Sequence, residues 1–177
     1  MKALLVIDAQ NVIVNFKDFS KELALIESVI HDFKQNNDPV IFIKQIDEKE
    51  DHPFYRKSKG AELHQSLEKH VDSVIEKSTP SSFFNTTLQS FLEEKEIKHV
   101  FITGFNTEFC CMFTAIAAYD RGYQVTFIEP ATGTVNDAEV YEMEGLDVRD
   151  FVGTVLHWSN AIEVLDEVEY AEKYKND

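Results

Sequence analysis

The chain has 177 residues, of which 44% are hydrophobic, and this length and composition favour one compact domain over residues 1–177. Its 17 basic and 32 acidic residues give a net charge of −15, which disfavours unspecific binding to nucleic acid or to an anionic membrane. No apolar run has the length of a membrane span, and the run from Ala3 to Ile7 is too short for a secretory signal. We therefore expect a cytoplasmic protein whose partner is a small molecule.

Short apolar runs alternate with longer amphipathic segments, a pattern typical of βα units around a mainly parallel sheet. The runs expected to form strands are residues 3–7, 40–43, 71–75, 100–103, 125–128 and 154–156. Apolar residues that repeat every three or four positions predict helices over 23–33, over 88–92, and from Thr107 or Glu108 to near Gly122. The sequence thus predicts an α/β fold.

Two segments carry weaker patterns. Residues 47–60 mix dense charge with two aromatic residues beyond the second predicted strand, so they form either a lid over a ligand site or a solvated loop. Ser159 resembles the N-cap of a last helix that would begin at Ala161. The tail from Asp166 to Asp177 is acidic and polar, and we expect it to fray from about residue 169.

Three residues with reactive side chains follow predicted strands. Asp8 comes directly after the first strand, and Lys77 ends the third. Cys110 lies in the first turn of the helix after the fourth strand, where unpaired N–H groups and the helix dipole favour a thiolate. Because parallel strands end at one edge of a sheet, these residues would bring a base, a cation and a nucleophile together. Each alone also has an ordinary role, as a helix cap, a solvated lysine or a buried thiol.

The two cysteines of the chain, Cys110 and Cys111, are adjacent. They provide neither a disulfide framework nor the CxxC spacing of metal and redox sites. Adjacent thiols oxidise readily when one of them is a thiolate, so a redox-sensing or binding protein is an alternative to an enzyme. Cys111 alone also fits a small buried hydrophobic position.

Four motifs occur along the chain from the first predicted strand to beyond the fifth. They are Asp8-Ala9-Gln10-Asn11, Gly60-Ala61-Glu62-Leu63-His64, Lys77-Ser78-Thr79-Pro80-Ser81-Ser82-Phe83-Phe84, and the stretch from Gly104 to Ala115 that continues to Tyr123. Together they resemble the isochorismatase-like cysteine hydrolases, in which the same motifs occur in this order. Gly104, Thr107 and Cys110 match that family's spacing around its nucleophile. The resemblance therefore identifies Cys110, rather than Cys111, as the nucleophile.

The resemblance implies a three-layer, Rossmann-like fold with a mainly parallel six-stranded sheet. It implies a catalytic triad, matched here by Asp8, Lys77 and Cys110. It also implies a non-proline cis peptide bond, which falls at Phe105-Asn106 in this chain. The backbone amides of Asn106 and Cys110 would form the oxyanion hole. No cofactor is expected for this chemistry.

We therefore predict a cysteine hydrolase that cleaves the C–N bond of a small amide. Asp8 would take the proton of Cys110, Lys77 would stabilise the negative charge, and the thiolate would attack the carbonyl to form a thioester that water hydrolyses. Vinyl-ether cleavage of isochorismate and hydrolysis of nicotinamide are alternatives, and the presence of both Cys110 and Lys77 favours amide hydrolysis. Residues 12–14 depart from the family pattern and leave the substrate open.

Nicotinamidases of this family carry a metal-binding Asp-x-His with a further His after the second strand. Here Asp47 is followed two positions later by Lys49. Asp47, Asp51, His52 and His64 have side chains that suit a hard cation or zinc, and a charged surface loop is the simpler interpretation. We expect no metal, and we expect activity to survive chelation.

Aromatic residues make up 12% of the chain. Phe54, Tyr55, Phe83, Phe84 and Phe113 fall in predicted loops or at helix starts, where a monomer need not bury them, and exposed aromatic residues are common at interfaces. The family resemblance also implies oligomers. We predict a homo-oligomer, most simply a symmetric dimer, whose association depends on salt because of the net charge.

Overall fold

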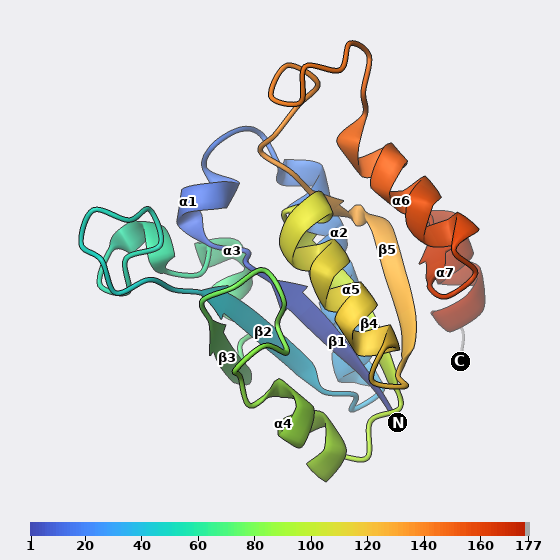
Figure 1. The fold of residues 1–177 in the computed structure, drawn as a ribbon. Helices are drawn as coiled ribbons and strands as arrows, with labels where there is room; N and C mark the ends of the chain where they lie inside the picture. Colours follow the sequence, from blue (N-terminus) through green and yellow to red (C-terminus); the bar gives the residue numbers. More distant parts are fainter. Residues whose placement is uncertain (176–177) are drawn as a thin grey trace.

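The computed structural model describes residues 1–175, and its centre is one six-stranded sheet in which all neighbouring strands are parallel (Figure 1). The strands are β1 (Lys2–Ile7), β2 (Val40–Gln45), β3 (Ser73–Lys77), β4 (His99–Phe105), β5 (Gln124–Gly133) and β6 (Glu163–Leu165). Their order in the sheet is β3-β2-β1-β4-β5-β6. The order reverses between β1 and β4, which is where ligands bind in open α/β sheets.

Helices cover both faces of the sheet and complete the three predicted layers (Figure 1). They are α1 (Asn11–Val14), α2 (Ser20–Gln35), α3 (Gln65–Glu68), α4 (Leu88–Glu94), α5 (Met112–Tyr119), α6 (Val148–Trp158) and α7 (Glu167–Tyr174), with a 3-10 turn η1 (Lys59–Ala61) and a π-helical turn η2 (Thr107–Cys111). Buried side chains of α2, α3 and α7 share one apolar cluster, and those of α4, α5 and α6 share the other. No helix within residues 1–175 is both long and apolar enough to cross a membrane.

The alternation of strand side chains produces these two cores. In β1, Leu4 and Val6 pack on the side of α2, whereas Ala3, Leu5 and Ile7 pack on the side of α5. All five are fully buried, and burial of an aliphatic side chain of the larger size stabilises a fold by roughly 1.5–3 kcal/mol. A strand that is buried on both faces needs a near-continuous apolar sequence, which is why β1 could be located from the sequence.

The strand ends that carry the candidate residues are held in register. Ile7 of β1 pairs with Gly104 of β4, and Gln45 of β2 pairs with Lys77 of β3. Gly104 has a φ of 113°, and a Cβ at this position would lie 2.0 Å from the carbonyl oxygen of Ile7. Glycine is therefore required for β4 to approach β1 directly beside Asp8.

The prediction of a strand at residues 154–156 is wrong, because this segment lies inside α6. The buried residues Val148, Val152 and Leu156 recur four apart, which is a helical spacing. The carboxylate of Asp147 accepts a hydrogen bond from the backbone of the first turn and caps the helix. Three consecutive apolar or β-branched residues were too short a signal to distinguish a strand from one turn of helix.

The helix predicted to begin at Ala161 does not form there, because the chain enters the edge strand β6. The last helix, α7, follows Asp166, whose side chain accepts a hydrogen bond from the Glu169 amide in a capping box. The tail expected to fray from about residue 169 is thus helical, and Tyr170 is buried in the α2-side cluster. Residues 176–177 of that prediction lie outside the described residues.

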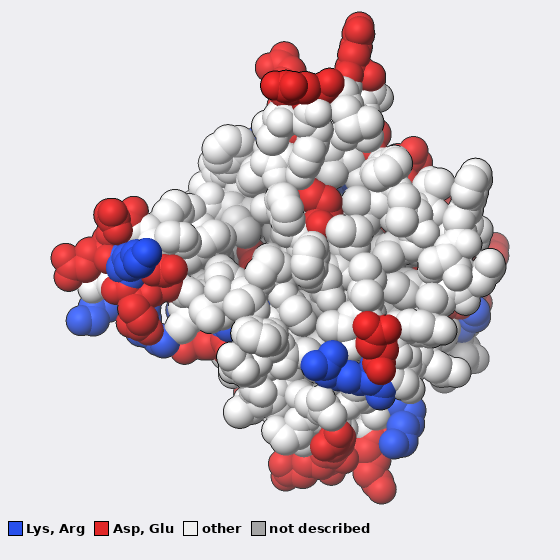
Figure 2. All heavy atoms as spheres, in the orientation of Figure 1, with Lys and Arg blue, Asp and Glu red and all other residues white. Residues whose placement is uncertain are grey.

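The aromatic residues predicted to be available for an interface differ in exposure. Phe83 is buried, Phe54 and Tyr55 are half-buried, and Phe84 and Phe113 are exposed. A larger exposed set, which we call the apolar α5–α6 face, consists of Phe109, Phe113, Ile116, Tyr119, Phe151, Val155 and Trp158. Figure 2 shows the molecule from the side of α5, where charged residues gather mainly at the edges of the view.

Candidate active site

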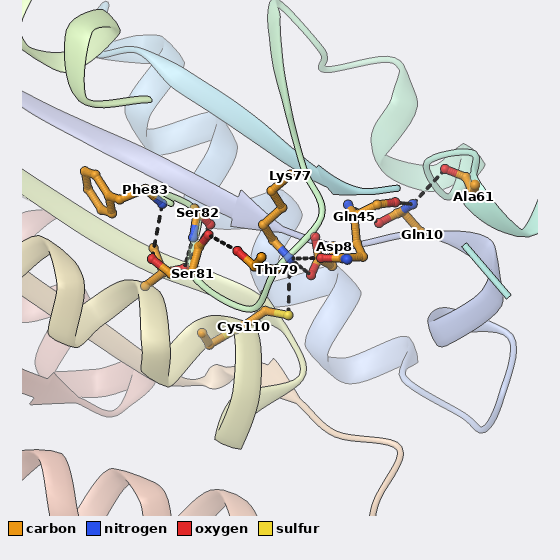
Figure 3. A network of polar contacts seen from close by, with 12 residues as sticks. Asp8, Gln10, Gln45, Ala61, Lys77, Thr79, Ser81, Ser82, Phe83 and Cys110 are labelled. Atoms are coloured by element: carbon orange, nitrogen blue, oxygen red, sulfur yellow. Dashed lines mark hydrogen bonds and ion pairs between the residues drawn. The ribbon is translucent and has the colours of Figure 1, made fainter. Parts of the chain in front are cut away.

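The ammonium group of Lys77 joins the three candidate residues at the carboxyl edge of the sheet (Figure 3). Its Nζ lies 2.7 Å from Asp8 Oδ2 and 3.2 Å from Cys110 Sγ. Asp8 follows β1, Lys77 ends β3 and Cys110 follows β4, so three separate strands deliver the three side chains. The strand ends therefore converge as the sequence predicted.

Asp8 is a fully buried carboxylate on a left-handed residue with a φ of 49°. Its Oδ2 accepts the hydrogen bond from Lys77, whereas Oδ1 has no hydrogen-bond partner within the described residues. Burial raises the pKa of Asp8, and this effect exceeds the opposing effects of Lys77 and of the Cys110 thiol. A carboxylate with one oxygen unpaired and a raised pKa is suited to accept a proton.

Lys77 is 3% exposed and is fixed by three acceptors. Besides Asp8 and Cys110, its ammonium donates to Gln45 Oε1 at 2.6 Å. Burial lowers the pKa of Lys77, but the negative charge of Asp8 and the hydrogen bonds to Asp8 and Cys110 raise it by more, so the net shift is upward. Since an ammonium has three donors, the cation is fully paired and stays charged.

Cys110 lies in the π-helical turn η2 rather than in the first turn of an α-helix. Cys110 is partly exposed, whereas Asp8 and Lys77 are buried. Burial and the Asp8 carboxylate raise the pKa of Cys110 to about 12, against the opposing effect of Lys77, so the protonated thiol is favoured despite the nearby helix start. The resting group is a thiol, and its proton must leave as the sulfur attacks.

Cys111 points into the core instead of the site. It is fully buried, and its Sγ lies 4.0 Å from the carbonyl oxygen of Thr103. Burial raises its pKa well above the ordinary value, so it stays a thiol. Cys111 therefore occupies the small hydrophobic position that was one interpretation of the sequence.

Two glutamines to which the sequence analysis assigned no role hold the site together. The side-chain amide of Gln10 donates to the carbonyl oxygens of Gln45 and Ala61, and its Oε1 accepts from the Gln45 backbone amide, each at 2.8 Å. Gln45 in turn presents its own Oε1 to Lys77. Gln45 is the last residue of β2, so the strand-end argument that located Asp8 applies to Gln45 as well.

The peptide bond between Phe105 and Asn106 is cis, as the family resemblance implied. Asn106 Oδ1 accepts a hydrogen bond from the Val135 amide at 3.1 Å, and the Asn106 carbonyl oxygen accepts one from the Cys111 amide at 3.2 Å. Asn106 is thus fixed on two sides immediately before the turn that carries Cys110. The backbone amides of Asn106 and Cys110 stay the predicted oxyanion-hole donors.

A second buried carboxylate, Glu108, lies two residues before Cys110 and had no signal in the sequence. Its Oε1 accepts hydrogen bonds from Thr134 Oγ1 at 2.7 Å, Asn136 Nδ2 at 2.7 Å and the Tyr141 hydroxyl at 3.0 Å. Its Oε2 has no partner within the described residues. Glu108 therefore fastens the segment that follows β5 to the turn η2.

The residues considered for a metal in the sequence do not gather around one point. Asp47 Oδ2 and His52 Nε2 lie 4.0 Å apart, and Asp51 is exposed. His64 instead places its Nδ1 2.8 Å from Ser66 Oγ and caps α3. Asp47 and His52 thus form a pair at the surface rather than a three-ligand site.

Known proteins resemble this chain in sequence and in fold. The family model described as Isochorismatase domain matches residues 2–159. The isochorismatase family protein YddQ of Bacillus subtilis (strain 168) is 32% identical over 144 residues, which are 75% of this chain and 77% of that protein. Nicotinamidase 3 of Arabidopsis thaliana is 41% identical over 71 residues, which are 40% of this chain and 35% of that protein.

Among solved structures, a cysteine hydrolase from Pseudomonas syringae pv. phaseolicola 1448A has a TM-score of 0.85 at 18% identity. The match covers 99% of this chain and 92% of the other, and at this identity it concerns the fold alone. The family model, by contrast, spans β1 to α6 and includes Asp8, Lys77 and Cys110. The chain therefore belongs to the isochorismatase family of hydrolases.

Proposed function

We propose that this hydrolase cleaves the C–N bond of a small amide through a thioester on Cys110. The observation that carries the proposal is the buried Lys77 ammonium, which contacts both Asp8 and Cys110. Vinyl-ether cleavage needs no nucleophilic sulfur, so the placement of the thiol against a base and a cation supports acyl transfer instead. The partial likeness to a plant nicotinamidase also supports an amide substrate.

In the first step, the thiol proton of Cys110 passes to Asp8 as the sulfur forms a bond to the amide carbon. The carbonyl electron pair moves to oxygen, and Lys77 compensates the negative charge that develops on sulfur during proton transfer. The backbone amides of Asn106 and Cys110 donate hydrogen bonds to the resulting oxyanion. One such donor is typically worth about 2.7–4 kcal/mol in the barrier.

In the second step, Asp8 returns the proton to the amide nitrogen, the C–N bond breaks, and an amine or ammonia leaves with the thioester remaining on Cys110. Water then gives a proton to Asp8 as its oxygen attacks the thioester carbon. The C–S bond breaks, the proton returns to sulfur, and a carboxylic acid is released. Each proton removed in this cycle is returned, so the cycle needs no oxidant or reductant.

The substrate would enter where Cys110 is exposed. Two segments at the carboxyl edge, residues 47–60 after β2 and residues 132–145 from the end of β5 onward, are the parts of the chain that we expect to line its pocket. Hydrogen bonds from Thr134, Asn136 and Tyr141 to Glu108 hold the second segment against η2.

The proposal is tested with a panel of small amides, nicotinamide included, together with isochorismate, measuring release of ammonia or product. Cys110→Ala should abolish turnover, whereas the matched variant Cys111→Ala should retain it. A substrate-derived adduct on Cys110 should appear by mass spectrometry of the quenched wild-type reaction. Turnover that survives Cys110→Ala, or cleavage of isochorismate alone, would overturn the proposal.

The expectation of metal-free catalysis is tested in the same assay. Prolonged treatment with EDTA should leave turnover unchanged, because none of the steps above uses a metal. Loss of activity with EDTA and its recovery with zinc or iron would contradict this expectation.

A further inference from the structure

A cluster of two imidazoles and a carboxylate lies on the α2 side of the sheet, whereas Cys110 packs on the α5 side. His31 follows Glu27 by one turn of α2, and His70 lies in the turn between α3 and β3. One ligand atom from each of the three residues lies within 4.8 Å of the others. We propose that Glu27, His31 and His70 form a binding site for a divalent first-row transition metal ion such as zinc.

The distances suit such an ion. Glu27 Oε1 lies 2.9 Å from His70 Nε2 and 4.0 Å from His31 Nε2. Tetrahedral zinc with ligand bonds of about 2.0–2.1 Å separates its ligands by about 3.4 Å, which falls between these two values. The side chain of His31 is 56% exposed and can rotate, whereas His70 is held by burial. A small movement of His31 is therefore sufficient to close the site.

A cation already occupies the position on Glu27 that a metal would take. Lys69 Nζ lies 2.7 Å from Glu27 Oε1, and the Lys69 side chain is 61% exposed, so it can move into solvent. Imidazole nitrogens suit zinc, copper, iron and nickel, and two histidines with one glutamate are a known ligand set of zinc.

The site would connect α2 to the turn that precedes the edge strand β3. The ion pair between Lys34 of α2 and Asp72, at 2.7 Å, spans the same junction. Since β3 is bound to a neighbouring strand on one side only, a metal here would hold the strand that ends at Lys77. Metal binding should therefore raise the thermal stability of the folded chain.

The test is a Co²⁺ titration of the full chain under reducing conditions, followed by absorbance, with Zn²⁺ as competitor. One equivalent should bind with the spectrum of nitrogen and oxygen ligation, and a hundredfold excess of metal over Kd should raise Tm by roughly 5 °C or more. His31→Ala should weaken binding at least about tenfold. Lys69→Ala should tighten binding, because it removes the competing ammonium. His157→Ala, which removes an exposed histidine of α6, should leave binding unchanged.

Three results would overturn the proposal. The first is absence of saturable binding in the wild-type chain. The second is binding that His31→Ala leaves unchanged or that His52→Ala abolishes, since the ion would then lie at the Asp47–His52 pair. The third is a thiolate-to-cobalt charge-transfer band, which would place the ion at a cysteine. If His31→Ala does not fold, Lys69→Ala still tests the proposal, because this variant is expected to bind the metal more tightly than the wild-type chain.

Discussion

Asp8 and Glu108 are both buried carboxylates near Cys110, and they differ in what faces them. In each, one oxygen is hydrogen-bonded and the other has no partner within the described residues. Asp8 faces the Lys77 ammonium and the thiol, whereas Glu108 faces two hydroxyls and a side-chain amide. Burial alone therefore does not make a carboxylate reactive, and the neighbouring groups determine its role.

The difference follows from how a buried charge is balanced. An unpaired charge in the interior is costly, so Asp8 depends on a cation, and the same cation can compensate negative charge on the sulfur. Glu108 is balanced by three neutral donors, all from side chains on the segment after β5. The first arrangement allows a proton to move, and the second holds a loop in place.

Amide substitutions test this comparison most directly, because they preserve the size of each side chain. Asp8→Asn should reduce kcat/KM by roughly 10²–10⁴, the usual contribution of a general base. Glu108→Gln should change kcat/KM by less than about threefold, because it keeps the acceptor oxygen for the loop. Steady-state kinetics on the amide identified in the panel measures both.

Circular dichroism should show that both variants fold, which makes the kinetic comparison valid. Equal losses of activity in the two variants would mean that Glu108 also takes part in proton transfer. Unchanged activity in Asp8→Asn would exclude Asp8 as the base.

The sequence was sufficient for the parts of the site that lie at strand ends. The apolar run before Asp8 and the motif around Cys110 are local signals, and sheet geometry brings them together. Glu108 could not be assigned a role, because its partners lie 26 to 33 positions away in a segment without regular pattern. The sequence indicated a helix terminus that favours a thiolate, but it could not show that burial and Asp8 raise the pKa of Cys110 by more.

The strands of the fold also differ in how clearly their sequences predict them. Strands β1, β2 and β4 are buried on both faces, so their sequences are continuous apolar runs. Strand β6 is a three-residue edge strand with one buried residue, and its sequence carries almost no signal. The segment 154–156 was mistaken for the sixth strand because one turn of an amphipathic helix also presents adjacent apolar residues.

The next largest effect on kcat/KM is expected from Lys77, the cation that faces Asp8 but not Glu108. Lys77→Met should reduce kcat/KM by roughly 10²–10³, because the developing negative charge on sulfur loses its partner. The activity of the wild-type enzyme should fall as the pH drops through the pKa of Asp8, which burial places above the ordinary value. Since Lys77 lowers that pKa, its removal should move the acidic limb to higher pH.

A pH profile of kcat/KM for wild type and Lys77→Met measures this shift. A limb that stays in place would mean that a group other than Asp8 is the base. A limb that moves to lower pH would contradict the charge pairing between Lys77 and Asp8.

The role of Glu108 in holding a loop predicts a change in stability rather than in chemistry. Glu108→Ala removes the acceptor of three hydrogen bonds and should lower the free energy of unfolding by roughly 2–4 kcal/mol. Glu108→Gln should lower it by less than about 1.5 kcal/mol, since Oε1 is retained. Urea unfolding followed by fluorescence measures both, and equal losses in the two variants would contradict the proposed role of Oε1.

The smallest effect on catalysis is expected at an apolar hollow that the buried Glu108 lines together with Phe109, Phe113 and Phe151. The seven residues that define the apolar α5–α6 face are uncharged, and four of them, Phe109, Phe113, Phe151 and Val155, line this hollow on a chain whose net charge is −15. Two copies that meet here would bury aromatic surface and keep their acidic residues apart, so we expect a symmetric dimer through this face.

Light scattering at micromolar concentration and moderate salt should therefore give about twice the chain mass of 20.4 kDa. Phe113→Glu places a charge in the centre of the apolar α5–α6 face and should yield monomers, whereas Phe16→Glu, at an exposed position outside it, should not. Because Phe113 lies on α5 and makes no contact in the Asp8–Lys77–Cys110 network, the monomer should keep kcat within about threefold of wild type. A larger loss of kcat would mean that the subunit interface helps to form the active site, and a monomeric wild-type chain would exclude the dimer.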